Sequence, residues 1–592
     1  MATPIALILP SDGAARQARQ RSVARDAKEF ANSYRSARGV FRSFGARALG
    51  ALLAALALGA CTRVGTAPRR GTLHPWTQPD TVRIGMYEEP DTLNPVISSM
   101  AFTSDVAQLL YDGLIRYDAR GRAIPDLARE LPSLRNGGIS RDGRTITYHL
   151  MPAARWSDSV PVTARDVIFT WRAIMNPRNR TATRTGYDRI AAIDAPDPHT
   201  VRLRLTSPYA PALYLFRDLN QGAIVPEHVL ARYSDINRVP FNTHPVGSGP
   251  YILRVWHHGS EMRFDANDHY FRGAPQIPHV VVRFITDQNT LLAQLRTHEI
   301  DVGYDLSLQQ IAQLRALAGV RVADSSTLHW EHLNFNVRRP PLDDRAVRVA
   351  LCTAIDERTI FEKVYHGLGR AAPVHFNPDF GWGDPKVRYY RYDPRAAAQQ
   401  LEAAGWKLGS DGTRYKGGKP LAFTLSTVAG VKAREAIEVL LQNAWHALGA
   451  DVEVKNFPAA TLFAPAAAGG VLYGGKTDVA IFTWQDVTPD PDDTAFVGPK
   501  QLPPSGENAT FYVNPQLGRL ELAGVATYDP AKRKPIYAAI GRMLIADVPE
   551  YVLDWLPEVT AANVDLHGPG PTPVGSDLWN IASWSYGPKA SL

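Results

Sequence analysis

Strand-like and helix-like segments alternate along almost the whole chain after residue 80, and this mixture limits the fold classes open to it. Thr81–Met86 (TVRIGM) and Thr200–Leu205 (TVRLRL) are predicted strands. Between them, apolar residues from Val167 to Met175 recur at helical spacing until Asn176-Pro177 ends the segment. The pattern has no fixed-period repeat, so it predicts an α/β or α+β architecture of several lobes. At 592 residues and 45% hydrophobic content, the chain can bury a large core in about three or four domains.

Several predicted helices carry start and stop signals. Thr163 is a predicted N-cap with Asp166 three residues later, a variant of the capping box. Similar signals predict helices over residues 102–114, closing at Gly113; 357–366, between Asp356 and Gly367; and 395–404, between Asp393-Pro394 and Gly405.

The N-terminus has the composition of an export signal. Residues 1–47 hold nine basic and three acidic side chains, and residues 48–60 hold no charge at all. Thirteen uncharged residues are too few to span about 30 Å of hydrocarbon as a helix, but they suit a signal-peptide core. Leu58-Gly59-Ala60-Cys61 resembles a bacterial lipobox, which predicts a lipid on Cys61. The alternative is a plain secretory signal with Cys61 incidental. The basic stretch is long for a signal peptide, which leaves the true start codon open.

The charge of the chain is concentrated in that leader. Residues 1–47 carry +6 of the total of +7, so the remainder is nearly neutral and presents no basic surface for nucleic acid. Residues 62–79, rich in Gly, Pro, Thr and Arg, are predicted to form a flexible tether. Cys352 lies in an apolar run and is predicted to be a buried thiol; with Cys61 lipidated it has no disulfide partner.

The sequence lacks the common catalytic motifs. It has no G-x-S-x-G elbow, H-E-x-x-H pair or Walker loop, and Gly247-Ser248-Gly249-Pro250 is predicted to be a turn that leads into a strand. His329 and His332 have no evident third metal ligand. A calcium loop starting at Asp486 or Asp490 would need glycine at its sixth position, where Pro491 or Ala495 stands instead. We therefore predict no catalytic residue, no metal and no cofactor.

Residues 478–493 (DVAIFTWQDVTPDPDD) contain the candidate ligand site. The first half alternates like a strand with both faces partly covered, and the second half is a loop with carboxylates at Asp486, Asp490, Asp492 and Asp493. A strand that ends in an acidic loop could pair with an extended peptide and meet its α-ammonium. The alternative is an ordinary core strand followed by a solvated acidic turn.

Seven segments, in order, resemble one family, the bacterial extracellular solute-binding proteins, family 5, of peptide ABC importers. Residues 155–167 (RWSDSVPVTARDV) match the family pattern kWsDGtPvtAeDV, with Ser159 where glycine is usual. The other matches are residues 91–95 (tLNP), 110–114 (yegL), 125–128 (PdLA), 246–251 (vGtGPY), 299–301 (geiD), and 333–336 with 341–348 (l.fN…pPfdD.rvR.A). The resemblance runs from about residue 81 to the C-terminus.

The resemblance implies an α/β fold: a two-lobed periplasmic-binding-protein-like clamshell of class II type, with an extra subdomain on the first lobe, that closes around its ligand by hinge motion. The implied divisions are residues 1–61 for the signal peptide and lipobox, 62–79 for the tether, 80–110, 220–325 and 556–592 for the first lobe, 111–219 for the extra subdomain, and 326–555 for the second lobe.

The resemblance also implies a ligand site. In peptide-binding members, an Asp shortly after a Trp binds the amino terminus of the peptide, in a pattern like W-x-x-D-x-x-D-P-D. Trp484 and Asp490-Pro491-Asp492 fit this pattern, but Asp486 lies one residue nearer the Trp than expected. The implied ligand-binding residues are Asp486, Trp484, Phe482 and Ala480, with the ligand backbone pairing along residues 480–484.

The implied function is an exported, lipid-anchored monomer, in the periplasm or at the cell exterior, that captures peptides and delivers them to an ABC permease. The partners are the peptide ligand, the permease subunits, and the membrane through the lipid only; no nucleic acid is expected. Two alternatives remain: a receptor of the same fold for a nickel chelate, opine or oligosaccharide, and an exported hydrolase.

Overall fold

The computed structural model describes residues 73–181, 183–369, 373–376, 380–382, 384, 386–388, 390–485, 488–504, 506–574 and 577–587. The chain divides into two units, Met1–Arg69 and Arg70–Leu592, and all that follows concerns the second. The predicted signal peptide, Cys61 and most of the tether lie outside the described residues, as does Asp486.

A mixed sheet of ten strands runs through the described part of the chain. Both kinds of pairing occur in it: β1 pairs with β9 and β15 with β16 in parallel, whereas β11 with β18 and β8 with β7 and β9 pair antiparallel. The prediction of a mixed α/β architecture is therefore confirmed. In sheet order the strands are β16 (Asp451–Val454), β15 (Ala422–Ser426), β17 (Val479–Gln485), β11 (Val320–Phe335), β18 (Glu550–Asn563), β10 (Val302–Gly303), β1 (Thr81–Met86), β9 (His279–Phe284), β8 (Glu261–Ala266) and β7 (Tyr251–His257).

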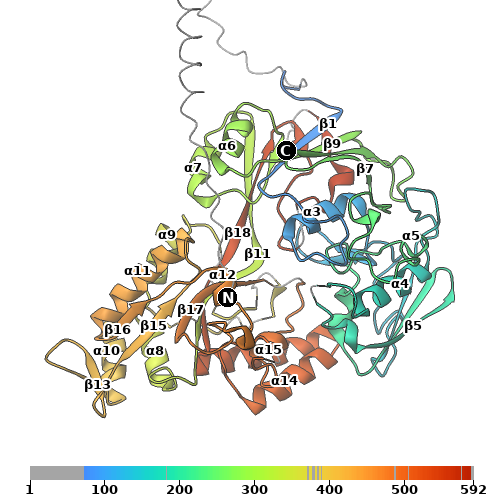
Figure 1. Cartoon of the computed structure of the whole chain (residues 1–592). Coiled ribbons are helices and arrows are strands. Elements are labelled where there is room, and N and C mark those ends of the chain that lie inside the picture. Colours follow the sequence, from blue (N-terminus) through green and yellow to red (C-terminus); the bar gives the residue numbers. More distant parts are fainter. Residues whose placement is uncertain are drawn as a thin grey trace, which may run out of the picture. The chain divides into compact units, whose positions relative to one another are not determined.

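The two longest strands, β11 and β18, lie side by side at the centre of this sheet (Figure 1). Their register shifts twice. At the larger break Ser326 pairs with Pro557 and pairing resumes only at Trp330 with Trp555; a second shift follows between Glu331 and His332. The two sides of the larger break join different parts of the sheet: β10 pairs with Ala561 and Ala562 of β18 on one side, and β17 pairs with β11 from His329 to Phe335 on the other. The predicted lobe boundaries at residues 325/326 and 555/556 fall at this break and stay a prediction.

Two large apolar cores meet at the break. The indole rings of Trp330 and Trp555 are fully buried in the first core, with centroids 5.4 Å apart, whereas Leu333 and Phe335 belong to the second. Cys352 is fully buried in the second core, as predicted, and burial raises the pKa of its thiol.

Smaller sheets lie in the segment predicted as the extra subdomain. β4 (Thr145–His149), β6 (Thr200–Leu205) and β5 (Ile190–Asp197) form one sheet, and β2 (Ile115–Tyr117) pairs with β3 (Ala123–Pro125). The helix predicted after Thr163 is confirmed as α4 (Ala164–Met175), and the Thr163 N–H donates to Asp166 Oδ2 at 2.8 Å. Ser159, in the position where the family usually has glycine, adopts a φ of 72°.

The other predicted helices are present with two corrected ends. The helix expected to close at Gly113 is α3 (Ala101–Leu110), which ends because Tyr111 is already extended, with φ −135° and ψ 160°. α9 (Glu357–Lys363) ends before His366, whose φ of 55° is left-handed. The remaining helices are α5 (Glu227–Leu230), α6 (Gln288–Arg296), α7 (Ile311–Arg315), α8 (Arg345–Thr353), α10 (Pro394–Ala403), α11 (Lys432–Ala447), α12 (Ala459–Leu462), α13 (Thr494–Val497), α14 (Pro515–Ala526) and α15 (Pro530–Asp547). In the part of the chain that the structure describes, none of these helices is long and apolar enough to cross a membrane.

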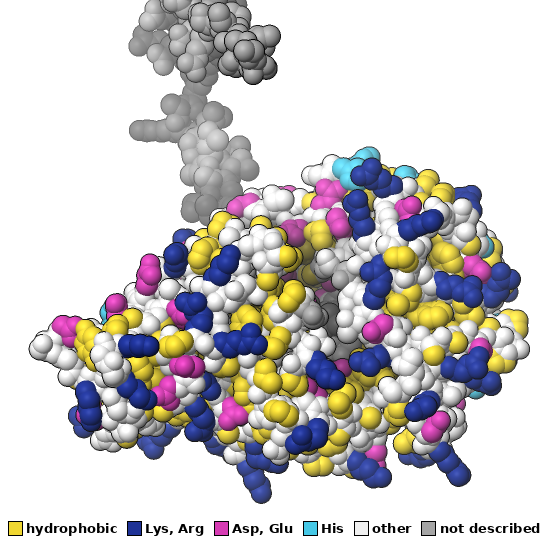
Figure 2. All heavy atoms as spheres, turned by 60° about the horizontal axis from the view of Figure 1, so that its bottom comes forward, with side chains coloured by type: hydrophobic (Ala, Val, Ile, Leu, Met, Phe, Trp, Pro, Cys, Tyr) yellow, Lys and Arg dark blue, Asp and Glu magenta, His cyan; other side chains and the backbone are white. Residues whose placement is uncertain are grey.

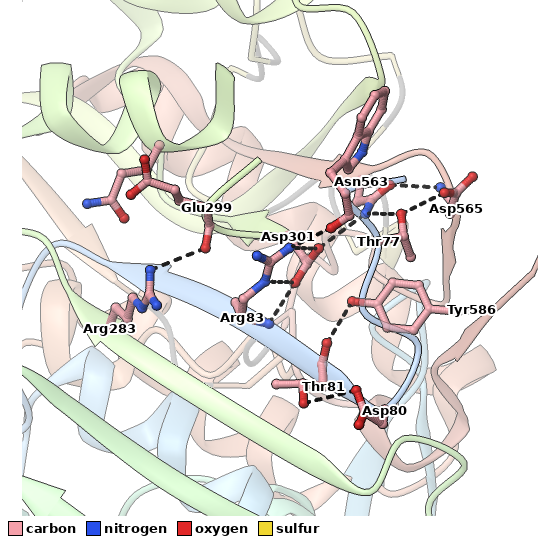
Figure 3. A network of polar contacts seen from close by, with 12 residues as sticks. Thr77, Asp80, Thr81, Arg83, Arg283, Glu299, Asp301, Asn563, Asp565 and Tyr586 are labelled. Carbon is pink, nitrogen blue, oxygen red and sulfur yellow. Dashed lines mark hydrogen bonds and ion pairs between the residues drawn. The ribbon is translucent and has the colours of Figure 1, made fainter. Parts of the chain in front are cut away.

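A buried polar network fastens the first strand to the C-terminal part of the chain (Figure 3). Arg83 on β1 forms two hydrogen bonds with the carboxylate of Asp301, of 2.7 and 2.9 Å, and Asn563 at the end of β18 donates to the same carboxylate at 3.1 Å. Thr77 donates to Asp565 at 2.7 Å, and the His74 N–H does so at the same distance. Segments at the two ends of the described chain thus form one rigid cluster.

Candidate functional site

A cavity of about 270 Å³ lies where β11 and β18 lose their register. Its walls come from five regions: the start of α3, the residues after β10, residues 217–221, residues 572–574, and the irregular part of the two long strands. The strand residues in the wall are 327–329 of β11 and 556–558 of β18. Figure 2 shows that one face of the molecule is hollowed near its middle, with both basic and acidic side chains around the hollow.

The broken ladder explains why the strands open here. The Thr327 hydroxyl donates to the carbonyl of Leu556 at 2.9 Å and accepts from the N–H of His329 at 3.0 Å. A side chain thus takes the place of ladder hydrogen bonds, as at a β-bulge, and residues 327–329 do not pair with β18. The local sequence therefore forms part of the cavity wall instead of a continuous strand.

The charged side chains of the cavity wall are mainly acidic. They are the carboxylates of Asp105, Asp305 and Glu558 and the guanidinium of Arg217. Burial raises the pKa of Glu558 well above its usual range, and the charges of Asp577, Asp305 and Asp105 raise it further. Asp305 is exposed, but enclosure by the cavity raises its pKa, with Glu88 adding to this and a hydrogen bond from Tyr87 opposing it. These carboxylates repel one another in surroundings that solvate them poorly.

Of two further groups in the wall, one is neutral and the other is a cation without an ion-pair partner among the described residues. Burial lowers the pKa of His329 to about 4, so its imidazole is neutral near pH 7. Arg217 is 6% exposed, donates only to the carbonyls of Tyr214 and Asn220, at 3.4 and 3.5 Å, and forms no ion pair with a described residue.

The predicted site residues on β17 lie beside this cavity but do not line it. The side chains of Ala480 and Phe482 are fully buried, and the Phe482 ring packs between His332 and Trp484, at 4.4 and 5.3 Å. Trp484 is partly buried against Phe496 at 4.9 Å. The role of Asp486 stays a prediction, since this residue lies outside the described residues.

The backbone of β17 has one edge that is only partly used. β11 pairs with β17 along its whole length, from Val479 to Gln485. On the opposite edge, β15 pairs only with Val479 and Ala480, and the Thr427 hydroxyl donates to the carbonyl of Ile481. From Phe482 to Gln485, no described residue forms a backbone pair with this edge. The edge ends next to the cavity, because Gln485 pairs with His329 in the cavity wall.

The other carboxylates of the predicted acidic loop have structural partners. Asp490 forms two hydrogen bonds, of 2.5 and 2.7 Å, with Arg533, in a pair that is almost fully buried. Asp492 accepts from Tyr209 at 3.3 Å and from Thr494.

Asp493 belongs to a second buried pairing, with His375, whose Nε2 lies 3.1 Å from Asp493 Oδ2 while Nδ1 contacts Glu550. Burial lowers the pKa of His375, but Glu550 and Asp493 outweigh it and hold that pKa well above its usual range. Asp490, Asp492 and Asp493 are therefore used in hydrogen bonds and ion pairs within the protein. No described group of three or more His, Cys, Asp or Glu is arranged to hold a metal ion.

Sequence reasoning missed the charged residues of the cavity wall. Glu558 carried a weak signal, since it is one of three carboxylates, with Glu550 and Asp554, in the largely apolar strand β18. Asp105 and Asp305 lie on segments two hundred residues apart with no local motif that joins them.

Comparison with known proteins identifies the family to which this chain is similar. A profile of the bacterial extracellular solute-binding proteins, family 5 (middle region), matches residues 122–497. Protein XP55 of Streptomyces lividans is 31% identical over 472 residues, which is 79% of this chain and 82% of that protein. The oligopeptide-binding protein AppA of Bacillus subtilis is 26% identical over 508 residues, 85% of this chain and 90% of AppA.

Solved structures agree in fold. NikZ from Campylobacter jejuni, in complex with Ni(L-His), matches with a TM-score of 0.70 and 26% identity over 86% of this chain and 100% of NikZ. The structural neighbours share the two-lobed periplasmic-binding-protein fold, which confirms the predicted fold class. With a profile match over more than half of its 592 residues, the chain belongs to the bacterial extracellular solute-binding proteins, family 5.

Proposed function

We propose that the protein is a receptor that captures peptides between its two lobes and delivers them to an ABC import permease. The observation that carries the proposal is the unpaired edge of β17 from Phe482 to Gln485, which ends beside the cavity at His329. An extended peptide can add to such an edge through hydrogen bonds that do not depend on its side chains. The names of relatives such as AppA, an oligopeptide-binding protein, support the same ligand class.

Lobe closure is part of the proposal. Tyr528, between α14 and α15, is hydrogen-bonded to the backbone of Tyr209 and Gly143 in the predicted extra subdomain. Tyr209 in turn donates to Asp492 in the predicted second lobe. Such contacts would form as the lobes close, and the closed state is the one that a permease would bind.

Asp486 is the predicted anchor for the peptide ammonium. Asp486→Asn should weaken peptide binding strongly, because a desolvated ammonium that loses its carboxylate costs several kcal/mol. Isothermal titration calorimetry measures this, with Asp324→Asn as the matched control on an exposed stretch of β11. Unchanged affinity in Asp486→Asn would remove Asp486 from the site.

Ligands that co-purify with the protein identify the solute class. We expect short peptides in mass spectra of the material released by denaturation. The protein has no catalytic role in this proposal, so added peptides should be recovered intact; their turnover would favour the exported hydrolase instead.

A second candidate is a receptor for a metal chelate, favoured by the likeness to NikZ, whose structure contains Ni(L-His). A chelate brings its own ligands, so it needs no metal-binding cluster in the protein. Titration with Ni(L-His) separates the two candidates: tight binding of the chelate without peptide binding would replace the first by the second.

We also propose that the mature protein is a lipid-anchored monomer outside the cytoplasm, attached through Cys61. Mass spectrometry of the mature N-terminal peptide should find a diacylglycerol on Cys61. A mature N-terminus elsewhere, without lipid, would contradict this anchor.

A further inference from the structure

The cavity wall has more acidic than basic side chains. None of the ion pairs in the described ranges joins Asp305 or Glu558 to a basic side chain. Asp577, whose charge acts on Glu558, is 1% exposed and accepts from Thr560, so it is a buried carboxylate that forms no ion pair with a described residue. Buried carboxylates without a cation are costly, and proteins retain such groups mostly at functional sites.

Three other polar groups of the same wall are buried with unused hydrogen-bonding capacity. The Tyr304 hydroxyl, the Asn220 side-chain carbonyl and the Arg217 Nε–H have no partner among the described residues, and the three residues are 1%, 8% and 6% exposed. Buried polar groups are satisfied in the great majority of cases, so unpaired ones that line a cavity indicate a ligand. They are independent of the carboxylates, since they include a donor cation and two neutral groups.

We propose that this cavity binds a cationic group of the solute, an ammonium or guanidinium, against Asp105, Asp305 and Glu558, while Arg217 faces an anionic group of the same solute. The inference deepens the proposed function and rests on it: the preferred peptides carry a basic side chain. Arg217 lies in residues 217–221, whereas Glu558 lies on β18, so the two charges come from separate wall segments. A dipolar solute with excess positive charge would satisfy both.

An organic cation suits this wall better than a bare metal ion. The three carboxylates are not among any described group with the arrangement needed to hold a metal. Ca²⁺ and Mg²⁺ require oxygen ligands at closely defined distances, whereas an ammonium or guanidinium can be held by several carboxylates at varied distances. The neutral imidazole of His329 adds no repulsion to such a cation.

Peptides of one length and different charge test the inference. The full mature protein is titrated calorimetrically with Ala-Ala-Ala, Ala-Lys-Ala and Ala-Glu-Ala, and with free L-lysine. We expect Ala-Lys-Ala to bind about tenfold tighter than Ala-Ala-Ala, or more, and Ala-Glu-Ala to bind weakest.

Two variants locate the effect. Glu558→Gln and Asp305→Asn should each reduce the preference for Ala-Lys-Ala about tenfold, whereas Asp324→Asn should leave it unchanged. Asn tolerates the left-handed φ of 54° at residue 305, so this change keeps the backbone. Glu558→Gln should also melt at the same or a higher temperature than the parent, which excludes unfolding as the cause of weaker binding.

The outcomes distinguish the two proposals. If the peptides bind with equal affinity, or the acidic one binds tightest, the charge inference is wrong and the peptide receptor stands. If no peptide binds but L-lysine does, with a loss in Glu558→Gln, peptide capture is wrong and the cationic site stands. If neither peptides nor L-lysine bind, both are wrong.

Discussion

The Tyr528 hydroxyl offers a direct test of closure, because it links parts of the chain that the proposal assigns to different lobes. It lies 3.0 Å from the carbonyls of Gly143 and Tyr209 and accepts from the Tyr209 N–H at 3.3 Å. A hydroxyl has one proton, so it donates one hydrogen bond and accepts another. In the open protein water would replace both.

Tyr528→Phe should therefore destabilise the closed state alone. Two net hydrogen bonds of about 0.5–1.5 kcal/mol each give roughly 1–3 kcal/mol, or roughly a 5- to 100-fold weaker ligand affinity if binding requires closure. The unfolding midpoint without ligand should change little. Calorimetric titration with the co-purified ligand measures the affinity, and small-angle scattering measures the compactness with and without it.

The matched control is Tyr586→Phe. Tyr586 donates one hydrogen bond, of 3.1 Å, to the carbonyl of Thr81, between segments of the same predicted lobe. This variant should lose about 1 kcal/mol of unfolding free energy and keep its ligand affinity. If Tyr528→Phe behaves in the same way, the Tyr528 contacts are structural and the closure argument is wrong.

Three further predictions concern stability. Arg533→Met leaves Asp490 buried without its cation and should lower the unfolding free energy, measured by urea titration, by about 3–5 kcal/mol. Adding Asp490→Asn should recover much of that loss. An equal loss in the double variant would refute the argument from the ion pair. Burial raises the pKa of Asp577 to about 6 in the folded protein. Its protonated form therefore stabilises the fold at low pH, and this contribution, of about 3 kcal/mol, is lost as pH rises from about 4 through 6. Asp577→Asn should flatten the dependence of the unfolding free energy on pH in that window, and an unchanged slope would contradict the prediction. Ser159→Gly removes a serine from a left-handed backbone conformation and should raise the unfolding free energy by up to about 1 kcal/mol, with a slightly higher melting temperature. A clear loss of stability would show that the Ser159 side chain is needed there.

Start and stop signals in the local sequence predicted individual helices and strands well. β1 and α4 occupy the predicted residues, and α10 lies between Asp393, which accepts from the Ala396 N–H, and Gly405. These boundaries depend on interactions within a few residues of the chain, which a sequence displays directly. The end of α3 was missed: Tyr111 is extended, and Gly113 beyond it passes close to the backbone of Arg217, a contact between segments about a hundred residues apart that local sequence does not display.

The site was predicted less completely than the fold. The β17 strand was located correctly, but its side chains are buried, and only its backbone edge is open. Asp490 is bound by Arg533, 43 residues away, and sequence spacing gives no sign of that pair. The carboxylates of the cavity converge from α3, the segment after β10 and β18 only after the whole sheet has formed, so their proximity depends on topology.

The network around Arg83 and Asp301 has a mechanical consequence. Any pull on the chain ahead of His74 is resisted first by Asp565, and then by the Arg83–Asp301–Asn563 cluster. The force is therefore borne by residues close to the point where it is applied, at the end of β18 that lies away from the irregular stretch near Pro557. A tether attached at this end would fix one predicted lobe and leave the other free to move.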